Sequence, residues 1–476
     1  MGARLVASFG LAVAAVAHAA LEPQRVCIVG GGVGGSATAS FLRDLVPDPS
    51  AVEIVVFEQH DVVGGRIATF DYHGTTIEAG GTVFLTGNEY IMQFTKALNL
   101  TLRIPGDTLA SPPQMAIFNG REIVFQTSAI SWWNMAKLVW RYGPSSLRAF
   151  QSVVNDLLTR FRRVYDLQDA GQAFADPADL LRAMHLYELT QESLETKLVE
   201  AGVSPQLINE LLAGITRVNY GQNTTMTALA GAVGLAGSGD DLRSVRGGNP
   251  LMIQGLLKRA QAVVRTKTKV HSIQTTPSLQ VDTSNGLVSC QAVVVATPLE
   301  LTDMALPPSI ETPHRPFQTT HATFVQGELN GSKFEVAGPV AAGVVLTTES
   351  SNLPFSSMGL QHQRVDAANE TVSLFKVFSR SRWSEDHVKE WFDDGASVVK
   401  RFPWRAYPTY ITPEPIPKFK LADGVYYVNA IESAASAMEM SAVGARNVAL
   451  LIANQLKKTP RVYEATDDTK AAMDEL

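Results

Sequence analysis

The segment Val26-Cys-Ile-Val-Gly-Gly-Gly-Val-Gly-Gly35 decides the fold of this chain. Its apolar start predicts a strand, and Gly30, Gly32 and Gly35 then form the pattern G-x-G-x-x-G. Gly30 allows a tight turn, Gly32 lets a pyrophosphate approach the backbone, and Gly35 lets the next helix pack on its strand. The N-terminus of that helix, expected over 36–45, would face the phosphates. The segment therefore predicts a dinucleotide-binding βαβ unit.

Two later motifs indicate which dinucleotide binds. The apolar strand that begins at Val52 ends in Glu58, 23 positions after Gly35, where a carboxylate that binds a ribose belongs. Gln59 and His60 follow, with no arginine for a 2′-phosphate, so NADP is disfavoured. Gly64-Gly65-Arg66 comes next, a motif typical of FAD enzymes that resemble amine oxidases and absent from NAD dehydrogenases. The sequence therefore predicts FAD as the cofactor.

Length and composition limit the possible function classes. The chain has 476 residues, 45% of them hydrophobic and 18% charged, which suits a globular protein with two or three domains. The net charge is −6 and there is no basic run, so neither nucleic-acid binding nor anionic membrane binding is indicated. No later segment reaches the roughly 18 apolar residues of a membrane span. No zinc-binding spacing occurs, and no metal site is expected.

The N-terminus predicts entry into the secretory pathway. Residues 1–20 hold a charged Arg4, a short apolar stretch and the small-residue site Ala17-His-Ala19, as in a cleaved signal peptide. The expected location is a lumen, of a lysosome or vacuole, although the final Met473-Asp-Glu-Leu476 resembles an ER-retrieval signal. Glycosylation sequons begin at four asparagines, Asn99, Asn223, Asn330 and Asn369.

The chain has only two cysteines, Cys27 and Cys290. Both lie inside apolar strand patterns, and a protein of this size can be stable through its core alone. We interpret them as two separate buried thiols.

The motifs are dispersed, which predicts a discontinuous cofactor domain. We expect an α/β fold in which residues 22–110, 225–300 and 415–456 form a Rossmann-like FAD-binding domain of the amine-oxidase-like type. Residues 111–224 and 301–414 would form an α+β substrate domain, and 457–476 a C-terminal tail.

Periodicity predicts several individual elements. Apolar spacing predicts one helical face from Pro144 to Tyr165, which is expected to face the core. Trp132, Trp133 and Trp140 are candidates to line a lipid pocket. Helices are expected over 251–260, 384–399 and 434–455, and strands over 262–270, 291–298 and 424–429.

Five further segments are distinctive: 137–143 (KLVWRYG), 217–222 (RVNYGQ), 247–249 (GGN), 403–410 (PWRAYPTY) and 432–441 (ESAASAMEMS). Through these segments the chain resembles the prenylcysteine oxidases, also called prenylcysteine lyases. The resemblance runs from about residue 25 to 456. One departure is the segment 81–88, which lacks the His-Pro expected after Glu78-Ala-Gly-Gly81 near the flavin ring.

The resemblance implies oxidative cleavage of the thioether in farnesyl- or geranylgeranyl-cysteine. FAD would take a hydride from the isoprenoid carbon bonded to sulfur, and water would capture that carbon. The hemithioacetal would collapse to cysteine and an isoprenyl aldehyde, and molecular oxygen would give hydrogen peroxide. Because the cofactor supplies the difficult step, the chain needs no covalent nucleophile.

Candidate site residues follow from the motifs and the resemblance. On the substrate side we expect Tyr220, Gln222 and Glu439, although Tyr220 can equally be a buried tyrosine with a satisfied hydroxyl. Small residues over 228–235 would form either a wall for the isoprenoid chain or a tight helix contact, and Arg217, Arg243 or Arg246 would bind the cysteine carboxylate. Cofactor-binding residues are expected to be Gly30, Gly32, Gly35, Glu58, Gly64, Gly65, Arg66, Gly81, Thr82, Val270, Glu432 and Met440.

Two alternatives stay open at this point. The altered segment 81–88 leaves room for a related flavin oxidase that acts on another apolar substrate, such as an amine or a polyene. A homologue that binds lipids without turnover would also keep the glycines, Glu58, Arg66 and Glu432.

Overall fold

The computed structural model describes residues 23–107, 109, 113–237, 241–338, 340–349, 353–365 and 369–458. The predicted signal peptide and the C-terminal residues 473–476 lie outside the described residues.

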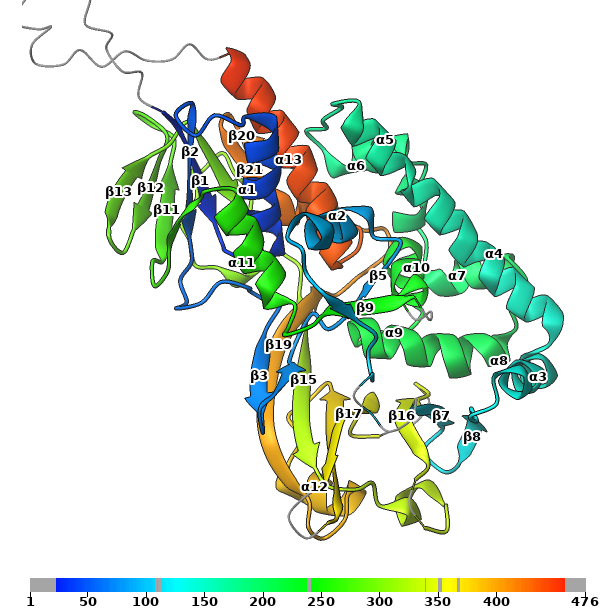
Figure 1. The fold of residues 1–476 in the computed structure, drawn as a ribbon. Helices are drawn as coiled ribbons and strands as arrows, with labels where there is room; N and C mark the ends of the chain where they lie inside the picture. The colour runs from blue at the N-terminus through cyan, green and yellow to red at the C-terminus, as the bar shows by residue number, and fades with distance from the viewer. Residues whose placement is uncertain are drawn as a thin grey trace, which may run out of the picture.

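A six-stranded sheet forms the centre of the cofactor domain, with β1 (Gln24–Val29) inside it (Figure 1). The strand order is β10-β2-β1-β14-β21-β20, and only β20 runs antiparallel to its neighbour. The strands come from three separate parts of the chain, as predicted for the α/β fold. Their bounds are β2 Val52–Phe57, β10 Val263–Arg265, β14 Ala292–Val295, β20 Lys420–Ala422 and β21 Val425–Tyr427.

This sheet is covered on both sides (Figure 1). Helices α1 (Val33–Leu45), α11 (Pro250–Arg259) and α13 (Met438–Lys458) lie on one side, where α1 contacts both of the others. An antiparallel sheet of β11 (Val270–Gln274), β12 (Gln280–Thr283) and β13 (Gly286–Ser289) lies on the other side. The apolar β1 and β14 strands are therefore buried on both faces, which explains their continuous apolar runs.

The second large sheet belongs to the substrate domain and has the order β19-β15-β18-β17-β16-β7-β8. Helix α12 (Glu385–Trp391) packs on one face through Val388 and Trp391, and the hairpin β3–β4 packs on the other through Tyr72 and Ile77. The hairpin belongs to the cofactor segment, so this second face is the joint between the two domains. The bounds are β3 Thr69–Tyr72, β4 Thr75–Glu78, β7 Gln114–Phe118, β8 Ile123–Gln126, β15 Phe317–Gln326, β16 Ala342–Thr347, β17 Ser357–Val365, β18 Thr371–Ser379 and β19 Ser397–Pro408.

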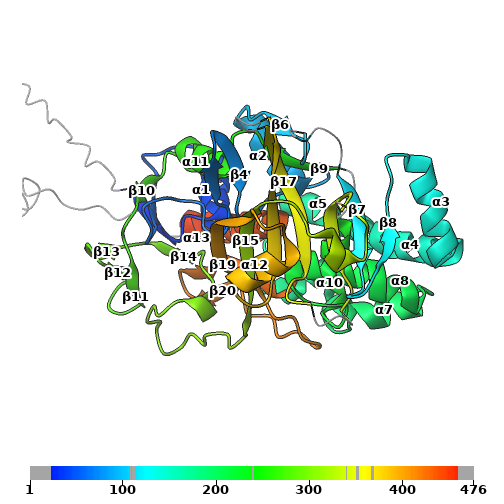
Figure 2. The ribbon, with the colours of Figure 1, turned by 90° about the horizontal axis from the view of Figure 1, so that it is seen from below.

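The remaining part of the substrate domain is helical and lies beside the cofactor domain (Figures 1 and 2). Its elements are α3 Ser131–Tyr142, α4 Pro144–Phe161, α5 Arg163–Asp169, α6 Pro177–Ala183, η1 Tyr187–Thr190, α7 Leu194–Glu200, α8 Pro205–Leu207, η2 Ile208–Leu212, α9 Ala213–Tyr220 and α10 Ala228–Ala236. A small sheet and one helix connect the domains. The sheet has the order β5 (Phe84–Leu85), β9 (Leu242–Val245) and β6 (Leu102–Arg103), and the helix is α2 (Glu89–Ala97).

Several predicted boundaries are wrong. The helix expected over 384–399 ends at Trp391, because Asp393, Asp394 and Gly395 form a turn and β19 begins at Ser397. The strand expected over 262–270 is two strands of different sheets, separated by a turn in which Lys267 has a φ of +51°.

The helix expected over 434–455 begins only at Met438, after the 3-10 helix η5 (Val428–Ser433). The apolar helical face predicted from Pro144 to Tyr165 is divided between α4 and α5, and Tyr165 belongs to α5.

The three tryptophans of α3 do not line an internal pocket. Trp132, Trp133 and Trp140 keep 71%, 46% and 88% of their surface exposed to solvent. The hypothesis that they line a lipid pocket is therefore wrong.

The interpretation of the cysteines as separate thiols is also wrong, because Cys27 and Cys290 form a disulfide across 263 residues of sequence. Cys27 lies in β1, and Cys290 precedes β14, the parallel neighbour of β1. Parallel pairing of these strands brings together two cysteines that are remote in sequence.

We expect removal of this disulfide to lower the stability of the fold. A cross-link over so long a loop restricts the unfolded chain, so the double variant Cys27→Ser/Cys290→Ser should lose about 2–5 kcal/mol of unfolding free energy. Denaturant unfolding without reductant would measure the loss. Wild-type protein unfolded in the presence of reductant is the control and should match the double variant; equal stability of all three samples would contradict the expectation.

Candidate functional site

The glycine loop after β1 has room for a ligand at one position only. A Cβ on Gly30, whose φ is +108°, would lie 2.7 Å from the Ala296 carbonyl oxygen, and a Cβ on Gly35 would lie 2.0 Å from the Gly30 carbonyl oxygen. Packing within the protein therefore requires these two glycines. At Gly32, the residue before the first turn of α1, the nearest atoms to an added Cβ are 3.9 Å away. The space over Gly32 suits a phosphate that approaches the free N–H groups of the helix start.

Glu58 lies beside this loop, at the end of β2. It is buried, and its carboxylate accepts hydrogen bonds from the N–H groups of Gly31 at 3.0 Å and His60 at 2.9 Å. The Thr268 N–H donates to the Glu58 carbonyl, whereas Val270 lies two residues further along, buried at the start of β11. Glu58 is therefore held at the edge where a ribose would meet the glycine loop.

The Gly64-Gly65-Arg66 motif folds against the same loop. The Gly64 N–H donates to the Gly31 carbonyl at 2.9 Å, and an added Cβ on Gly65 would lie 3.4 Å from the Gly32 Cα. Both glycines have positive φ, +139° and +58°, which favours glycine. Residues separated by about thirty positions thus form a continuous surface.

Arg66 connects this surface to the C-terminal part of the chain. Its guanidinium forms a two-pronged ion pair with Glu432 of η5 and donates to the Ala406 carbonyl of β19 at 2.8 Å. Glu432 is buried and also accepts a 2.9 Å hydrogen bond from Asn429. Burial alone would lower the pKa of Arg66, but the Glu432 carboxylate outweighs it and raises that pKa. The Arg66 guanidinium therefore remains charged.

Gly81 and Thr82 lie at the joint between the domains, in a polar cluster. The Asn249 side-chain amide donates to their carbonyl oxygens at 2.7 and 3.0 Å, and its backbone N–H donates to Glu78 at 2.8 Å. The second carboxylate oxygen of Glu78 is buried without a hydrogen-bond partner among the described residues. Burial raises the pKa of Glu78 to about 7.

Lys376 completes this cluster and was missed from the sequence. It lies in the middle of β18, almost fully buried, and its ammonium donates to the Thr82 hydroxyl at 3.2 Å and to the Glu78 carbonyl at 3.3 Å. Burial lowers the pKa of Lys376 to about 8. The sequence did contain a signal for this residue, because Lys376 stands between apolar residues of the strand Thr371–Ser379. Buried lysines are rare, so a lysine in such a strand indicates a special role.

Tyr220 and Gln222 lie close together near the C-terminal end of β19. The Tyr220 hydroxyl donates to the Ser436 carbonyl at 3.1 Å, and its ring meets those of Tyr407 and Tyr410 edge-on. Gln222 donates to the Pro408 carbonyl at 3.0 Å and accepts from the Tyr410 N–H at 2.8 Å. Both side chains therefore fasten the α9–α10 connection to the strand that also contacts Arg66.

Glu439 and Met440 lie in the first turn of α13, and both are buried. The Glu439 carboxylate accepts from the N–H groups of Tyr90 at 2.9 Å and Ile91 at 3.0 Å, at the start of α2, and from the Tyr165 hydroxyl at 2.7 Å. Burial raises the pKa of Glu439 to about 7. These contacts give Glu439 the role of capping α2.

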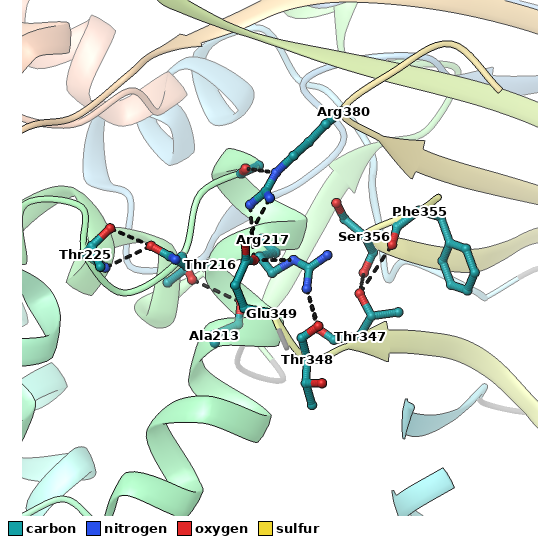
Figure 3. Close-up of polar contacts among 12 residues, drawn as sticks. Ala213, Thr216, Arg217, Thr225, Thr347, Thr348, Glu349, Phe355, Ser356 and Arg380 are labelled. Carbon is teal, nitrogen blue, oxygen red and sulfur yellow. Dashed lines mark hydrogen bonds and ion pairs between the residues drawn. The ribbon is translucent and has the colours of Figure 1, made fainter. Parts of the chain in front are cut away.

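A small charged cavity is lined in part by Arg217, which lies one helical turn before Tyr220 on α9; Figure 3 shows Arg217 with Glu349 and Arg380. Its volume is about 200 Å³, and Arg217, Arg380, Glu349 and Phe355 line it. Arg217 is buried and pairs with Glu349 at 3.1 Å, while Arg380 binds the same carboxylate at 2.9 and 3.1 Å. Of the other arginines considered, Arg246 is on the surface with Asp107, and Arg243 donates to the adjacent Leu242 carbonyl.

The small-residue helix α10 packs tightly on two sides. An added Cβ on Gly231 would meet Leu194 at 2.6 Å, and one on Gly234 would meet the Tyr220 ring at 3.0 Å. Ala228 and Ala232 line a cavity of about 410 Å³ between α4, α7 and α10. Helical periodicity places this cavity on the side of α10 that faces away from Tyr220.

Together, the glycine loop, Glu58 and the Arg66–Glu432 pair define a dinucleotide-binding oxidoreductase with an amine-oxidase-like arrangement of domains. The family model for prenylcysteine lyase matches residues 125–465, and the model for an NAD(P)-binding Rossmann-like domain matches residues 28–98. The chain belongs to the prenylcysteine lyase family.

Relatives of known name match nearly the whole chain. The chain is 37% identical over 448 residues to farnesylcysteine lyase of Arabidopsis thaliana and 36% identical over 461 residues to prenylcysteine oxidase 1 of Homo sapiens. Each match covers 90% of this chain and 88% of the relative.

Solved structures share the fold at low sequence identity. Cyclohexylamine oxidase from Brevibacterium oxydans superposes with a TM-score of 0.59 at 14% identity and covers 91% of this chain and 100% of its own. A fatty acid isomerase from P. acnes also gives 0.59 at 14% identity, covering 90% and 98%. These likenesses confirm the predicted fold class.

Substitutions at two glycines should separate cofactor binding from folding. Gly32 has a φ of −85° and free space, so Gly32→Ala should fold normally but bind the dinucleotide at least about tenfold more weakly, because the methyl group occupies the phosphate position. Gly35→Ala is the matched control and should destabilise the fold itself, since its Cβ would collide with the Gly30 carbonyl. Thermal unfolding of the cofactor-free proteins and the amount of cofactor released on denaturation would measure both effects. Full cofactor content in Gly32→Ala would contradict the assignment.

Proposed function

We propose that this chain is an FAD-dependent oxidase that cleaves the thioether of prenylcysteine. The overall change converts prenylcysteine, water and oxygen into cysteine, an isoprenyl aldehyde and hydrogen peroxide. The observation that carries the proposal is the intact cofactor surface, from Gly32 to the Arg66–Glu432 pair, in a chain that matches prenylcysteine lyases over most of its length.

The described residues fit FAD. Gly32 and the start of α1 would hold the pyrophosphate, Glu58 a ribose, and Arg66 with Glu432 the flavin end of the molecule. When bound, FAD would supply the acceptor for the hydride that leaves the carbon next to sulfur, and oxygen would take up the electrons.

Lys376 is the best placed group of this chain to handle a proton. It contacts Thr82, in the loop expected beside the flavin ring, and a lowered pKa of about 8 makes its neutral form accessible near neutral pH. In that form it would accept the hydroxyl proton of the hemithioacetal as the carbon–sulfur bond breaks. Its burial among Phe324 and Phe378 also keeps bulk water away.

The charged cavity suits the amino-acid end of the substrate. Arg217 and Arg380 would bind the carboxylate and Glu349 the ammonium group, because the three charges already converge there. Lys376 lies in β18, and Arg380 follows directly after the end of that strand. The amino-acid cavity and the proton-handling lysine thus belong to neighbouring positions of one chain segment.

We further propose that the protein acts in an oxidising lumen, of a lysosome or vacuole. The disulfide Cys27–Cys290 supports this, since structural disulfides are rare in reducing compartments. Of the four sequons, Asn99 and Asn369 are exposed and suit glycosylation, whereas Asn223 and Asn330 are partly buried and hydrogen-bonded to their neighbours.

The anaerobic half-reaction tests the function directly. Farnesylcysteine added without oxygen should bleach the oxidised flavin absorbance near about 450 nm. Air should restore the band and yield one hydrogen peroxide and one free thiol per turnover.

Three results would redirect the proposal. A yellow protein that farnesylcysteine does not bleach would favour another apolar substrate, and bleaching by an apolar amine instead would identify that class. A protein that binds farnesylcysteine but stays colourless with added FAD would be a lipid-binding homologue.

Substitution of Lys376 should reveal its role through the pH profile. If the neutral amine is the base, wild-type kcat rises with pH through about 8, because protonated lysine cannot accept a proton. Lys376→Met should lower kcat on the order of 10²-fold and remove that rise, with little change in KM.

Lys376→Arg is the matched control, since arginine keeps the charge but does not deprotonate. Equal loss of kcat in both variants, at full flavin content, would support the base. Restoration of activity by arginine would show that only the positive charge matters.

A further inference from the structure

Helix α3 is oriented in the opposite way to an ordinary surface helix. Its polar and charged side chains point into the protein, where Asn134 binds the Ser128 backbone and Lys137 donates to the Gln126 carbonyl at 3.0 Å. Arg141 forms a two-pronged pair with Glu210 at 2.7 and 2.8 Å. The hydrogen-bonding capacity of the helix is therefore used internally.

The outward side of α3 is apolar and aromatic. Trp132, Met135 and Val139 recur at intervals of three and four residues, and Trp133 and Trp140 are seven residues apart, so these five side chains share one side of the helix. Their exposed fractions are 71%, 59%, 37%, 46% and 88% in that order. We call these five residues the α3 patch.

The patch is prominently placed. Figures 1 and 2 both show α3 at the outer edge of the helical region, at the opposite end of the molecule from β11, β12 and β13. Exposed apolar side chains are normal when scattered, but a contiguous group marks a surface that binds something.

The segment that carries the patch has charges of one sign. Residues 123–155 contain no aspartate or glutamate, although the chain as a whole carries a net charge of −6. Their charged residues are Lys137, Arg141 and Arg148, of which Arg148 is exposed. The carboxylate of Glu210, from η2, is paired with Arg141. The segment itself therefore brings no acidic group to oppose lipid phosphates.

We propose that the α3 patch docks the protein on the surface of a phospholipid bilayer, with α3 lying in the plane of the interface. Tryptophan rings favour the headgroup level of membranes, where their apolar body is buried and their N–H remains hydrated. A helix of 12 residues is about 18 Å long, too short to cross the hydrocarbon core of about 30 Å. None of the helices that the structure describes is long and apolar enough to cross a membrane.

The driving force is apolar burial and not charge. Two of the three cations of the segment are already bound to Gln126 and Glu210, which leaves Arg148 as the free one. Attachment should therefore occur on neutral lipid and depend weakly on salt. A protein partner fits less well, because the charged side chains of the helix, Lys137 and Arg141, are already bound within the chain.

Vesicle binding tests the proposal on the full-length protein as secreted. Vesicles of neutral phosphatidylcholine should sediment the wild type, and its tryptophan emission should shift to shorter wavelength and be quenched by lipids brominated on their acyl chains. Trp132→Ser/Trp140→Ser should need at least about tenfold more lipid for half binding, and its unfolding temperature should not change, because both side chains are mostly exposed.

The matched control is Val263→Ser/Leu287→Ser, which removes two exposed apolar side chains, 44% and 61% exposed, from the far end of the molecule. It should bind vesicles like the wild type. Equal vesicle binding by the two double variants would overturn the proposal, as would binding only to anionic vesicles at low salt. If wild type forms a dimer that Trp132→Ser/Trp140→Ser abolishes, and binds no vesicle, the patch is an interface between copies of the chain.

Discussion

The ion pair between Arg66 and Glu432 is the interaction on which the cofactor site depends, because it joins residues 366 positions apart. Arg66 belongs to the first cofactor segment, Glu432 to the last, and the Ala406 carbonyl that Arg66 also binds lies at the end of the substrate sheet. Three separate parts of the chain thus meet at one guanidinium. A pair with one buried partner of this kind specifies geometry more than it adds stability, since desolvation of Glu432 opposes much of the Coulomb attraction.

A second polar cluster fixes the joint between the domains. Asn249 holds the Gly81–Thr82 backbone, and Lys376 reaches across from β18 to the same loop. Neutral residues would pack there at lower cost, because a buried lysine and a buried carboxylate both lose hydration. The chain nevertheless keeps both Glu78 and Lys376, and burial moves their pKa values toward neutrality. The proposed transfer of a proton requires pKa values of this kind.

Much of the cofactor domain could be predicted because its signals are local. The glycines, Glu58 and Gly64-Gly65-Arg66 are each recognised from a short stretch of sequence, and the structure brings these stretches into contact across about thirty positions. Features that depend on strand pairing were not predictable. Cys27 pairs with Cys290 because β1 and β14 are neighbours in the sheet. Lys376 is buried because the hairpin β3–β4 packs on the sheet that contains β18. The exposure of Trp132, Trp133 and Trp140 was not predictable either, since periodicity gives a face but not the direction in which it points.

The strand order of the central sheet also constrains how the protein is made. β1 and β2 leave the ribosome first, but β14 emerges more than two hundred residues later and β21 more than a hundred after that. Until then the flank of β1 that β14 will occupy is open, and an unpaired apolar strand edge invites aggregation. Synthesis of the substrate domain fills this interval. The surface that receives the cofactor can therefore close only when nearly the entire chain has been translated, so a nascent chain that stops early cannot be rescued by the cofactor.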